Sequence, residues 1–360
     1  MKKGLKVFLV AGALVILLST GVRLFQVPIS MALIDRQIAS VLDRDVIESL
    51  PEGLHVGLCG SGGPFPNRDR RATCVFVIAG TALYVIDAGS GASGNIDVMG
   101  LRAGNIRSVF LTHFHSDHID GLGELLLNRW VQRNADQPVP VYGPRGVETI
   151  VEGLRQAYSL DSIYRTAHHG AAIAPPEGAG GEPRPFDLGA SALASEVILE
   201  EDGLKVTAFT VDHSPIEPAV GYKFEYAGRT VVISGDTVKT DSVLKQARDA
   251  DVLVHEILQP SIIKRFEAEA RESGQNGIAK IMYDIPDYHT TPEEAAQLAE
   301  AAGVEYLLLY HVVPPLPKFF NKVLLGDAKS YFDGPIKVGE DGWIVSLPRK
   351  SEKIMDGSLM

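Results

Sequence analysis

The sequence predicts a protein of the α/β (α+β) class preceded by a hydrophobic helix. From Leu54 onward, short apolar runs typical of strands are separated by glycine turns and alternate with helical patterns. Several of these runs end at an ionisable residue, and the ends of the strands are where open α/β sheets place their sites. These residues are Asp87, His113, His213, Asp236, His255 and His311. Together they predict that the strand ends share one functional rim.

Residues 1–30 have the pattern of a signal anchor or a signal peptide. Lys2, Lys3 and Lys6 precede an uncharged run, Val7–Val22, which Arg23 closes. This run is longer than a typical signal-peptide core and slightly shorter than a typical membrane span. The absence of a clear Ala-x-Ala site favours an uncleaved anchor, but cleavage stays open. Because a positive N-terminus stays in the cytoplasm, we expect the body at the periplasmic face of the inner membrane, or free in the periplasm if the segment is cleaved.

The rest of the chain divides into a linker and one domain. Residues 31–53 predict a helical linker that ends at Pro51 and Gly53, and residues 54–350 predict a single catalytic domain. Within it, residues 168–187 are rich in Gly, Pro and Ala without periodicity, which predicts an exposed arm. The predicted strands are Leu54–Leu58, Cys74–Ile78, Leu83–Ile86, Val139–Tyr142, Leu204–Val211, Val220–Tyr226, Thr230–Ile233, Val252–Val254 and Tyr306–Tyr310, and the predicted helices are Gly121–Arg133, Val147–Tyr158 and Pro292–Ala302.

Composition limits the classes of partner. The 360 residues carry a net charge of −11 and no lysine- or arginine-rich block. A nucleic-acid binder normally carries a basic footprint, so nucleic acid is a disfavoured partner, although a local basic groove or metal ions could hold a phosphate. The chain has two cysteines, Cys59 and Cys74. They are either both reduced and buried or joined in a disulfide, which would contribute roughly 3 kcal/mol by closing a loop of about 15 residues.

The stretch Val109–His118 concentrates the chemistry of the chain. An apolar run ends at His113, His115, Asp117 and His118, and the first two histidines share a face of extended backbone. Imidazole and carboxylate together are ligands for zinc, and also for iron or manganese. A solvated loop explains one or two histidines, but not this density of ligands. The stretch therefore predicts a metal site.

His-x-His-x-Asp-His in this stretch resembles the signature of the metallo-β-lactamase superfamily. The resemblance spans about residues 54–346 and implies a four-layer αββα sandwich, here with an N-terminal hydrophobic anchor helix. It also implies two divalent ions, with Zn²⁺ first and Mn or Fe as alternatives. The implied ligands are His113, His115 and His213 for one ion, Asp117, His118 and His311 for the other, and Asp236 as a bridge. Such a pair lowers the pKa of a bridging water and yields a metal-bridging hydroxide.

Three further features resemble the ribonuclease Z and arylsulfatase-like branch of that superfamily. They are the glycine-rich loop from Gly60 to Arg71, the segment Val254-His255-Glu256, and Tyr288-His289-Thr290-Thr291 before a helix. The Pro-x-Lys-x-Arg-Asn motif of tRNA-processing enzymes is absent. The resemblance implies that His289 protonates the leaving oxygen, while Glu256 orients His289 and stabilises its charge. Asp117 is the candidate acceptor of the hydroxide's proton.

These residues predict a dinuclear, zinc-dependent hydrolase of a phosphodiester or related ester. The acidic balance favours a small ester substrate such as a phosphodiester, an aryl sulfate or a lactone. The alternatives are an arylsulfatase or lactonase, a true tRNA 3′-processing endonuclease, a β-lactamase, and an inactive metal-binding module. The membrane, through the N-terminal segment, and a second copy of the chain complete the candidate partners.

Overall fold

The computed structural model describes residue 12, residues 25–39 and residues 44–360. Residues 25–39 are helical and belong to a unit separate from Val46–Met360. Most of the predicted anchor or signal segment, and residues 40–43 of the predicted linker, lie outside the described residues. Among the described helices, none combines the length and the apolar character that crossing a membrane requires.

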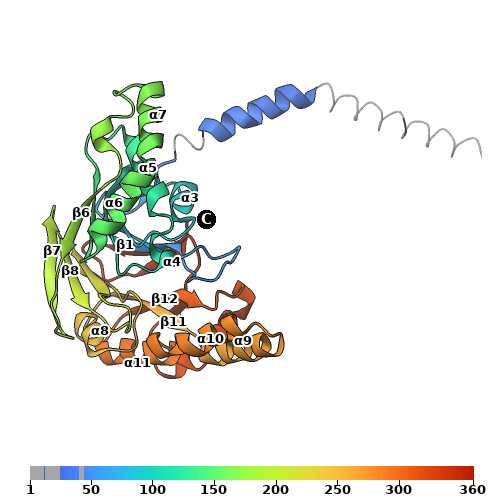
Figure 1. The fold of residues 1–360 in the computed structure, drawn as a ribbon, viewed down its shortest axis with the longest axis vertical. Coiled ribbons are helices and arrows are strands. Elements are labelled where there is room, and N and C mark those ends of the chain that lie inside the picture. The colour runs from blue at the N-terminus through green and yellow to red at the C-terminus, as the bar shows by residue number, and fades with distance from the viewer. Residues whose placement is uncertain (1–11, 13–24, 40–43) are drawn as a thin grey trace, which may run out of the picture. The chain divides into compact units, whose positions relative to one another are not determined.

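The larger unit contains two sheets, shown in Figure 1. The eight-stranded sheet has the order β15-β14-β1-β2-β3-β4-β5-β6 and the seven-stranded sheet has the order β13-β12-β11-β10-β9-β8-β7. The strands of the first sheet are β1 Gly53–Gly60, β2 Cys74–Ala79, β3 Ala82–Ile86, β4 Ile106–Phe110, β5 Val139–Pro144, β6 Gly181–Phe186, β14 Trp343–Pro348 and β15 Met355–Ser358. Those of the second are β7 Ser195–Glu201, β8 Leu204–Thr210, β9 Val220–Tyr226, β10 Arg229–Ile233, β11 Val252–Leu258, β12 Tyr306–Val313 and β13 Ile336–Val338.

Helices flank these sheets on their outer faces, so the predicted αββα sandwich is confirmed (Figure 1). The helices of the first half are α2 Val46–Ser49, α3 Ala92–Val98, α4 Ser116–Ile119, α5 Leu122–Arg133, α6 Val147–Ala157 and α7 Ser159–His169. Those of the second are α8 Asp241–Gln246, α9 Pro260–Glu272, α10 Asn276–Asp284, α11 Pro292–Ala302 and α12 Asn321–Leu325, and short 3₁₀ turns lie at Ala103–Asn105, Pro176–Gly178, Ile285–Tyr288, Lys318–Phe320 and Ala328–Ser330.

Alternation along the strands produces separate apolar layers. In β4, Phe110 faces the core between the sheets, where it stacks on Tyr142 with ring centroids 5.1 Å apart. Its neighbour Val109 faces the opposite side, toward the helices that cover the first sheet. The equivalent outer core of the second sheet packs β11 and β12 against α11. Because both faces of these strands are buried, they are apolar runs without alternating polarity.

The start of α11 is fixed by local sequence. Thr291 accepts a hydrogen bond from the backbone of Glu294, and the Glu294 side chain bonds back to Thr291, which completes a capping box. Pro292 occupies the first turn, where its missing N–H costs nothing. The helix therefore begins at a defined residue, and His289 and Thr291 before it have extended backbone.

Residues 168–187 differ from the predicted exposed arm. Gly181–Phe186 forms β6, which pairs in parallel with β5 at the edge of the first sheet. Ala174 and Gly178 are buried, and Trp130 Nε1 donates to the carbonyl of Pro175 at 2.8 Å. Pro183 and Pro185 explain why the sequence did not indicate this strand. Proline has no backbone N–H to donate within a sheet, and the edge position of β6 tolerates it.

Candidate metal centre

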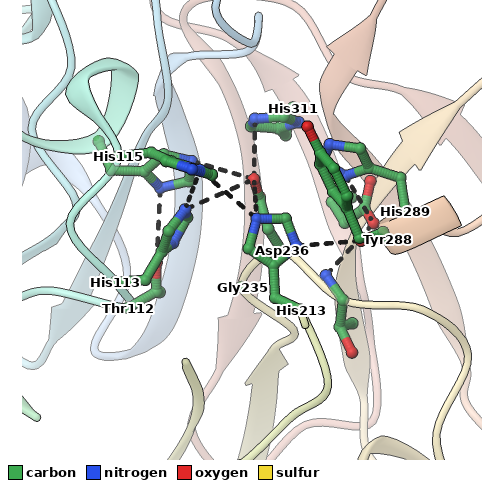
Figure 2. Close-up of polar contacts among 12 residues, drawn as sticks. Thr112, His113, His115, His213, Gly235, Asp236, Tyr288, His289 and His311 are labelled. Atoms are coloured by element: carbon green, nitrogen blue, oxygen red, sulfur yellow. Dashed lines mark hydrogen bonds and ion pairs between the residues drawn. The ribbon is translucent and has the colours of Figure 1, made fainter. Parts of the chain in front are cut away.

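The candidate ligands come from both sheets and lie close together. Figure 2 shows His113, His115, His213, Asp236 and His311 pointing toward one another. His113 and His115 follow β4, and Asp117 and His118 lie in α4, which begins immediately afterwards. From the other sheet, His213 follows β8, Asp236 follows β10, and His311 lies within β12. The structure therefore brings together all seven residues that the sequence suggested as ligands.

The first group comprises His113, His115, His213 and Asp236, whose ligand atoms lie within 4.8 Å of one another. His115 Nδ1 is 3.0 Å from His113 Nε2 and 3.5 Å from His213 Nε2. Ligands at about 2.0–2.1 Å from a tetrahedral ion are separated by roughly 3.4 Å. The spacing of these nitrogens therefore fits one ion.

The second group comprises Asp117, His118 and His311. Asp117 Oδ2 lies 3.1 Å from His311 Nε2 and 3.6 Å from His118 Nε2. These distances fit a second ion in the same way.

Asp236 lies between the two groups, at the centre of Figure 2. Its Oδ2 is 3.9 Å from the Nε2 atoms of both His113 and His213 in the first group. The same oxygen is 3.3 Å from His118 Nε2 and 3.2 Å from His311 Nε2 in the second. One carboxylate oxygen thus faces both sets of nitrogens, which is the geometry of a bridging ligand.

The electrostatics of the site favour bound cations. Burial lowers the pKa of His213 to about 4, so that imidazole is neutral and available as a ligand. At His118, burial is outweighed by the carboxylates of Asp236, Asp87 and Asp117, which raise its pKa well above the ordinary value. Asp236 shows the reverse shift, because His311 and His118 overcome its burial and lower its pKa well below the ordinary value. The carboxylates therefore stabilise positive charge between them.

Several ligands are oriented through their second ring nitrogen. His118 Nδ1 lies 2.7 Å from Asp87 Oδ2, and His213 Nδ1 lies 3.0 Å from the carbonyl of Tyr288. Thr112 donates both its backbone N–H and its hydroxyl to Asp87 at 2.8 Å, which fixes that carboxylate in turn. Partners of this kind set the tautomer and aim Nε2 into the site. Asp87 thus braces the ligand-bearing loop through Thr112 and His118.

His289 and Glu256 lie beside this centre. His289 Nδ1 is 3.2 Å from Glu256 Oε1, and a His289 nitrogen lies in one group with Asp236 and His311. Glu256 is held by the backbone N–H groups of Thr290 at 2.8 Å and Thr237 at 3.4 Å. Burial lowers the pKa of His289 to about 4 and raises that of Glu256 well above its usual range. Glu256 therefore does not keep His289 charged at neutral pH.

His255 does not join the rim. It is buried in β11, where successive side chains point to opposite faces, so Glu256 faces the site and His255 faces away from it. Its Nδ1 lies 2.8 Å from the carbonyl of Glu256. His168 and His169, at the end of α7, are exposed and belong to none of the metal-ligand groups found among the described residues.

The loop 60–73 and Tyr288 contribute contacts that sequence reasoning did not assign. The ring of Tyr288 lies 4.9 Å from the ring of His213 and 4.9 Å from that of His289. A Cβ at Gly63 would lie 2.9 Å from Cε1 of His311, so only glycine allows the loop to approach that ring. The base of the loop is closed by a disulfide between Cys59 and Cys74. The Gly60–Arg71 glycines were the available signal for this close approach.

The side chains present fit a pair of divalent metal ions. Buried polar atoms that make no hydrogen bond within the described part of the chain include His118 Nε2 and Asp236 Oδ1. Leaving such atoms without a partner is costly, and a metal ion would supply one. An αββα sandwich with this donor set at its strand ends defines the class of metal-dependent hydrolases with the metallo-β-lactamase fold.

Comparison with known proteins leads to the family. A beta-lactamase superfamily domain matches residues 84–312. The ribonuclease Z of Mycolicibacterium gilvum is 33% identical over 290 residues, which cover 80% of this chain and 94% of that protein. The ribonuclease Z of Mycobacterium bovis is also 33% identical over 80% of this chain, and the match covers 96% of its own length. The chain therefore belongs to the beta-lactamase superfamily and, within it, to the ribonuclease Z family, and it is a metal-dependent hydrolase acting on phosphodiester bonds.

Solved structures show the same fold. The short form of human tRNase Z superposes with a TM-score of 0.56 at 22% identity, covering 82% of this chain and 99% of that one. The metallo-beta-lactamase fold protein YhfI from Bacillus subtilis superposes with a TM-score of 0.57 at 18% identity, covering 84% of this chain and 99% of that one. At these identities the likeness supports the fold alone.

The relatives overturn the predicted location. The charges around Val7–Val22 predict a position at the periplasmic face of the inner membrane, or free in the periplasm. The relatives that match 80% of this chain are ribonucleases Z. The predicted location is therefore wrong.

Proposed function

We propose that this protein is an endoribonuclease of the ribonuclease Z type that hydrolyses a phosphodiester bond of RNA with two zinc ions. The observation that carries the proposal is Asp236, whose Oδ2 faces nitrogens of both ligand groups at 3.2–3.9 Å. His113, His115 and His213 would hold one ion, Asp117, His118 and His311 the other, and Asp236 both. Two divalent cations held there would supply a hydroxide nucleophile at neutral pH and neutralise the charge that develops on phosphorus.

Asp117 has a second role in this proposal. Its carboxylate contacts His118 and His311, and these two histidines outweigh its burial and lower its pKa to about 2. A carboxylate that stays ionised can bind a cation and accept a hydrogen bond from the attacking oxygen. Asp117 therefore orients the nucleophile against the phosphate.

His289 and Glu256 act on the leaving group. A neutral Glu256 carboxyl beside a neutral His289 imidazole contains the same number of protons as a carboxylate beside an imidazolium. The pKa of His289 is lowered and that of Glu256 is raised, so the pair holds one proton between the two side chains. An imidazolium with a pKa of about 4 is a strong donor, so His289 transfers the proton to the leaving ribose oxygen while Glu256 becomes the carboxylate.

Leaving groups of different basicity test this assignment. His289→Ala should lower cleavage of an RNA with a 3′ extension by roughly 10²–10⁴-fold, because a ribose oxygen leaves poorly without a proton. The same variant should retain most of its turnover of bis(p-nitrophenyl) phosphate, whose leaving group needs no acid. Equal losses on both substrates, with metal content unchanged, would contradict the acid role of His289.

The net charge of −11 favours a second candidate, a small phosphodiester substrate. A comparison of kcat/KM for the RNA and for small phosphodiesters, an aryl sulfate and a lactone decides between the candidates. Preference for the RNA by at least tenfold supports the ribonuclease. A chromogenic cephalosporin should not be turned over.

A further inference from the structure

Asp341, which is not among the candidate metal ligands, accepts hydrogen bonds on both of its carboxylate oxygens. It lies between β13 and β14, and its Oδ1 accepts from the backbone N–H and the hydroxyl of Ser61 at 2.9 and 2.8 Å. Its Oδ2 accepts from the backbone N–H of Arg71 at 2.8 Å and from Asn95 Nδ2 at 2.9 Å. One carboxylate thus holds the loop 60–73 near both of its ends.

Arg70 reinforces the same attachment from inside the loop. Its side chain is buried, and it donates to the hydroxyl of Ser61 at 3.2 Å and to the carbonyl of Gly339. It also donates to the carbonyl of Leu316 at 3.2 Å and to Asn321 Oδ1 at 3.1 Å. A buried guanidinium with this many acceptors is expensive to disturb. The Ser61 hydroxyl therefore donates to Asp341 and accepts from Arg70.

Ser61 passes this constraint to the metal centre. Its carbonyl accepts from the backbone N–H of Val312 at 2.9 Å, and Gly62 forms a parallel bridge with Val312. The residue before Val312 is His311, whose φ of 43° lies in the left-handed region that a non-glycine side chain rarely adopts. A Cβ at Gly63 would collide with the His311 ring, so the loop lies close against that ring. The unfavourable backbone at His311 is thus held in place by the loop.

We infer that Asp341 is a positioning residue for the second metal site, acting through Ser61 and Val312 on His311. The inference rests on the proposed role of His311 as a ligand of that ion. No hydrogen bond or ion pair among the described residues joins Asp341 to a ligand of the first ion. Its loss should therefore weaken one site and spare the other.

The test is Asp341→Asn. A side-chain amide has only one oxygen, so it can satisfy either Ser61 or the Arg71 and Asn95 donors, but not both. Chelator-buffered Zn²⁺ titration of the metal-free protein, followed by metal analysis, should show affinity for the second ion reduced on the order of 10-fold with the first unchanged. The cobalt-loaded variant should show an altered absorption band for one ion only. Ser61→Ala, which removes the shared hydroxyl and keeps the backbone bonds, should give a smaller change in the same direction.

Controls separate this effect from general loss of structure. Asp333→Asn, at an exposed carboxylate of the neighbouring turn, should bind both ions as the unchanged protein does. If Asp341→Asn binds both ions normally, or weakens both equally, the inference is wrong while the proposed function stands. If the unchanged protein binds only one ion, both the inference and the proposed function are wrong. If Asp341→Asn does not fold, unchanged binding of both ions by Ser61→Ala overturns the inference.

Discussion

Asp87 Oδ2 lies 2.7 Å from Nδ1 of His118, and neither side chain is exposed to solvent. This contact fixes the imidazole so that Nε2 faces Asp117 and Asp236. The same carboxylate accepts two bonds from Thr112, one residue before His113. Asp87 therefore organises the start of the ligand-bearing loop without contacting the proposed ions.

We expect Asp87→Asn to lower zinc affinity by about 10–100-fold, because the amide cannot accept from His118 as an anion does. Competition with a chromogenic chelator measures the change. Asp97→Asn, in helix α3 beside the same sheet, serves as the control and should keep the zinc affinity of the unchanged protein. Unchanged affinity in Asp87→Asn would show that His118 needs no partner to take up its orientation.

Asp236→Ala should release both ions rather than one, since its Oδ2 faces both ligand groups. Metal analysis after gel filtration should show the content of the variant falling toward zero. Asp120→Ala, at an exposed site directly after α4, should keep the full content. Retention of one tightly bound ion by Asp236→Ala would contradict the bridging role.

His255 makes stability depend on pH. Burial lowers its pKa to about 4 in the folded state, whereas an unfolded histidine titrates near 6.5. Between these values the unfolded chain binds more protons, so the free energy of unfolding falls as pH falls. By pH 5 this one group should cost about 2 kcal/mol relative to neutral pH. The free energy of unfolding of the metal-free protein, measured in urea from pH 7.5 to pH 5, should depend less on pH in His255→Gln than in the unchanged protein. In His168→Gln the pH dependence should match that of the unchanged protein.

Removal of the Cys59–Cys74 disulfide should lower the free energy of unfolding by about 3 kcal/mol, because the bond closes a loop of 15 residues. Urea titration of the Cys59→Ser/Cys74→Ser double variant measures this. A reducing agent should destabilise the original protein and leave the double variant unchanged. If both respond alike, the reagent acts elsewhere.

The sequence predicted most of the strand ends and the ligand-bearing stretch because these depend on local pattern. His113, His115, Asp117 and His118 are close in sequence, and their spacing alone indicated shared geometry. The hairpin of β9 and β10 was equally local, with its turn at Ala227-Gly228. Periodicity and turn chemistry are sufficient for such features.

Other features depend on contacts that no short window contains. Asp341 and Ser61 are 280 residues apart, so nothing in either neighbourhood marks their bond. The strand β6 was missed because its prolines are acceptable only at the edge of a sheet, a position set by tertiary structure. The direction of the His289 pKa shift also follows from burial, which overrides the effect of a nearby carboxylate.

The two sheets of the sandwich each contribute part of the donor set, and this gives the ions a mechanical consequence. An ion between His115 and His213 would join the two sheets across 98 positions of chain, and one between Asp117 and His311 would join them across 194 positions. Chelation would remove these cross-links together with the capacity for hydrolysis. The loaded protein should therefore melt at a higher temperature than the stripped one, and more steeply, because neither sheet could loosen alone.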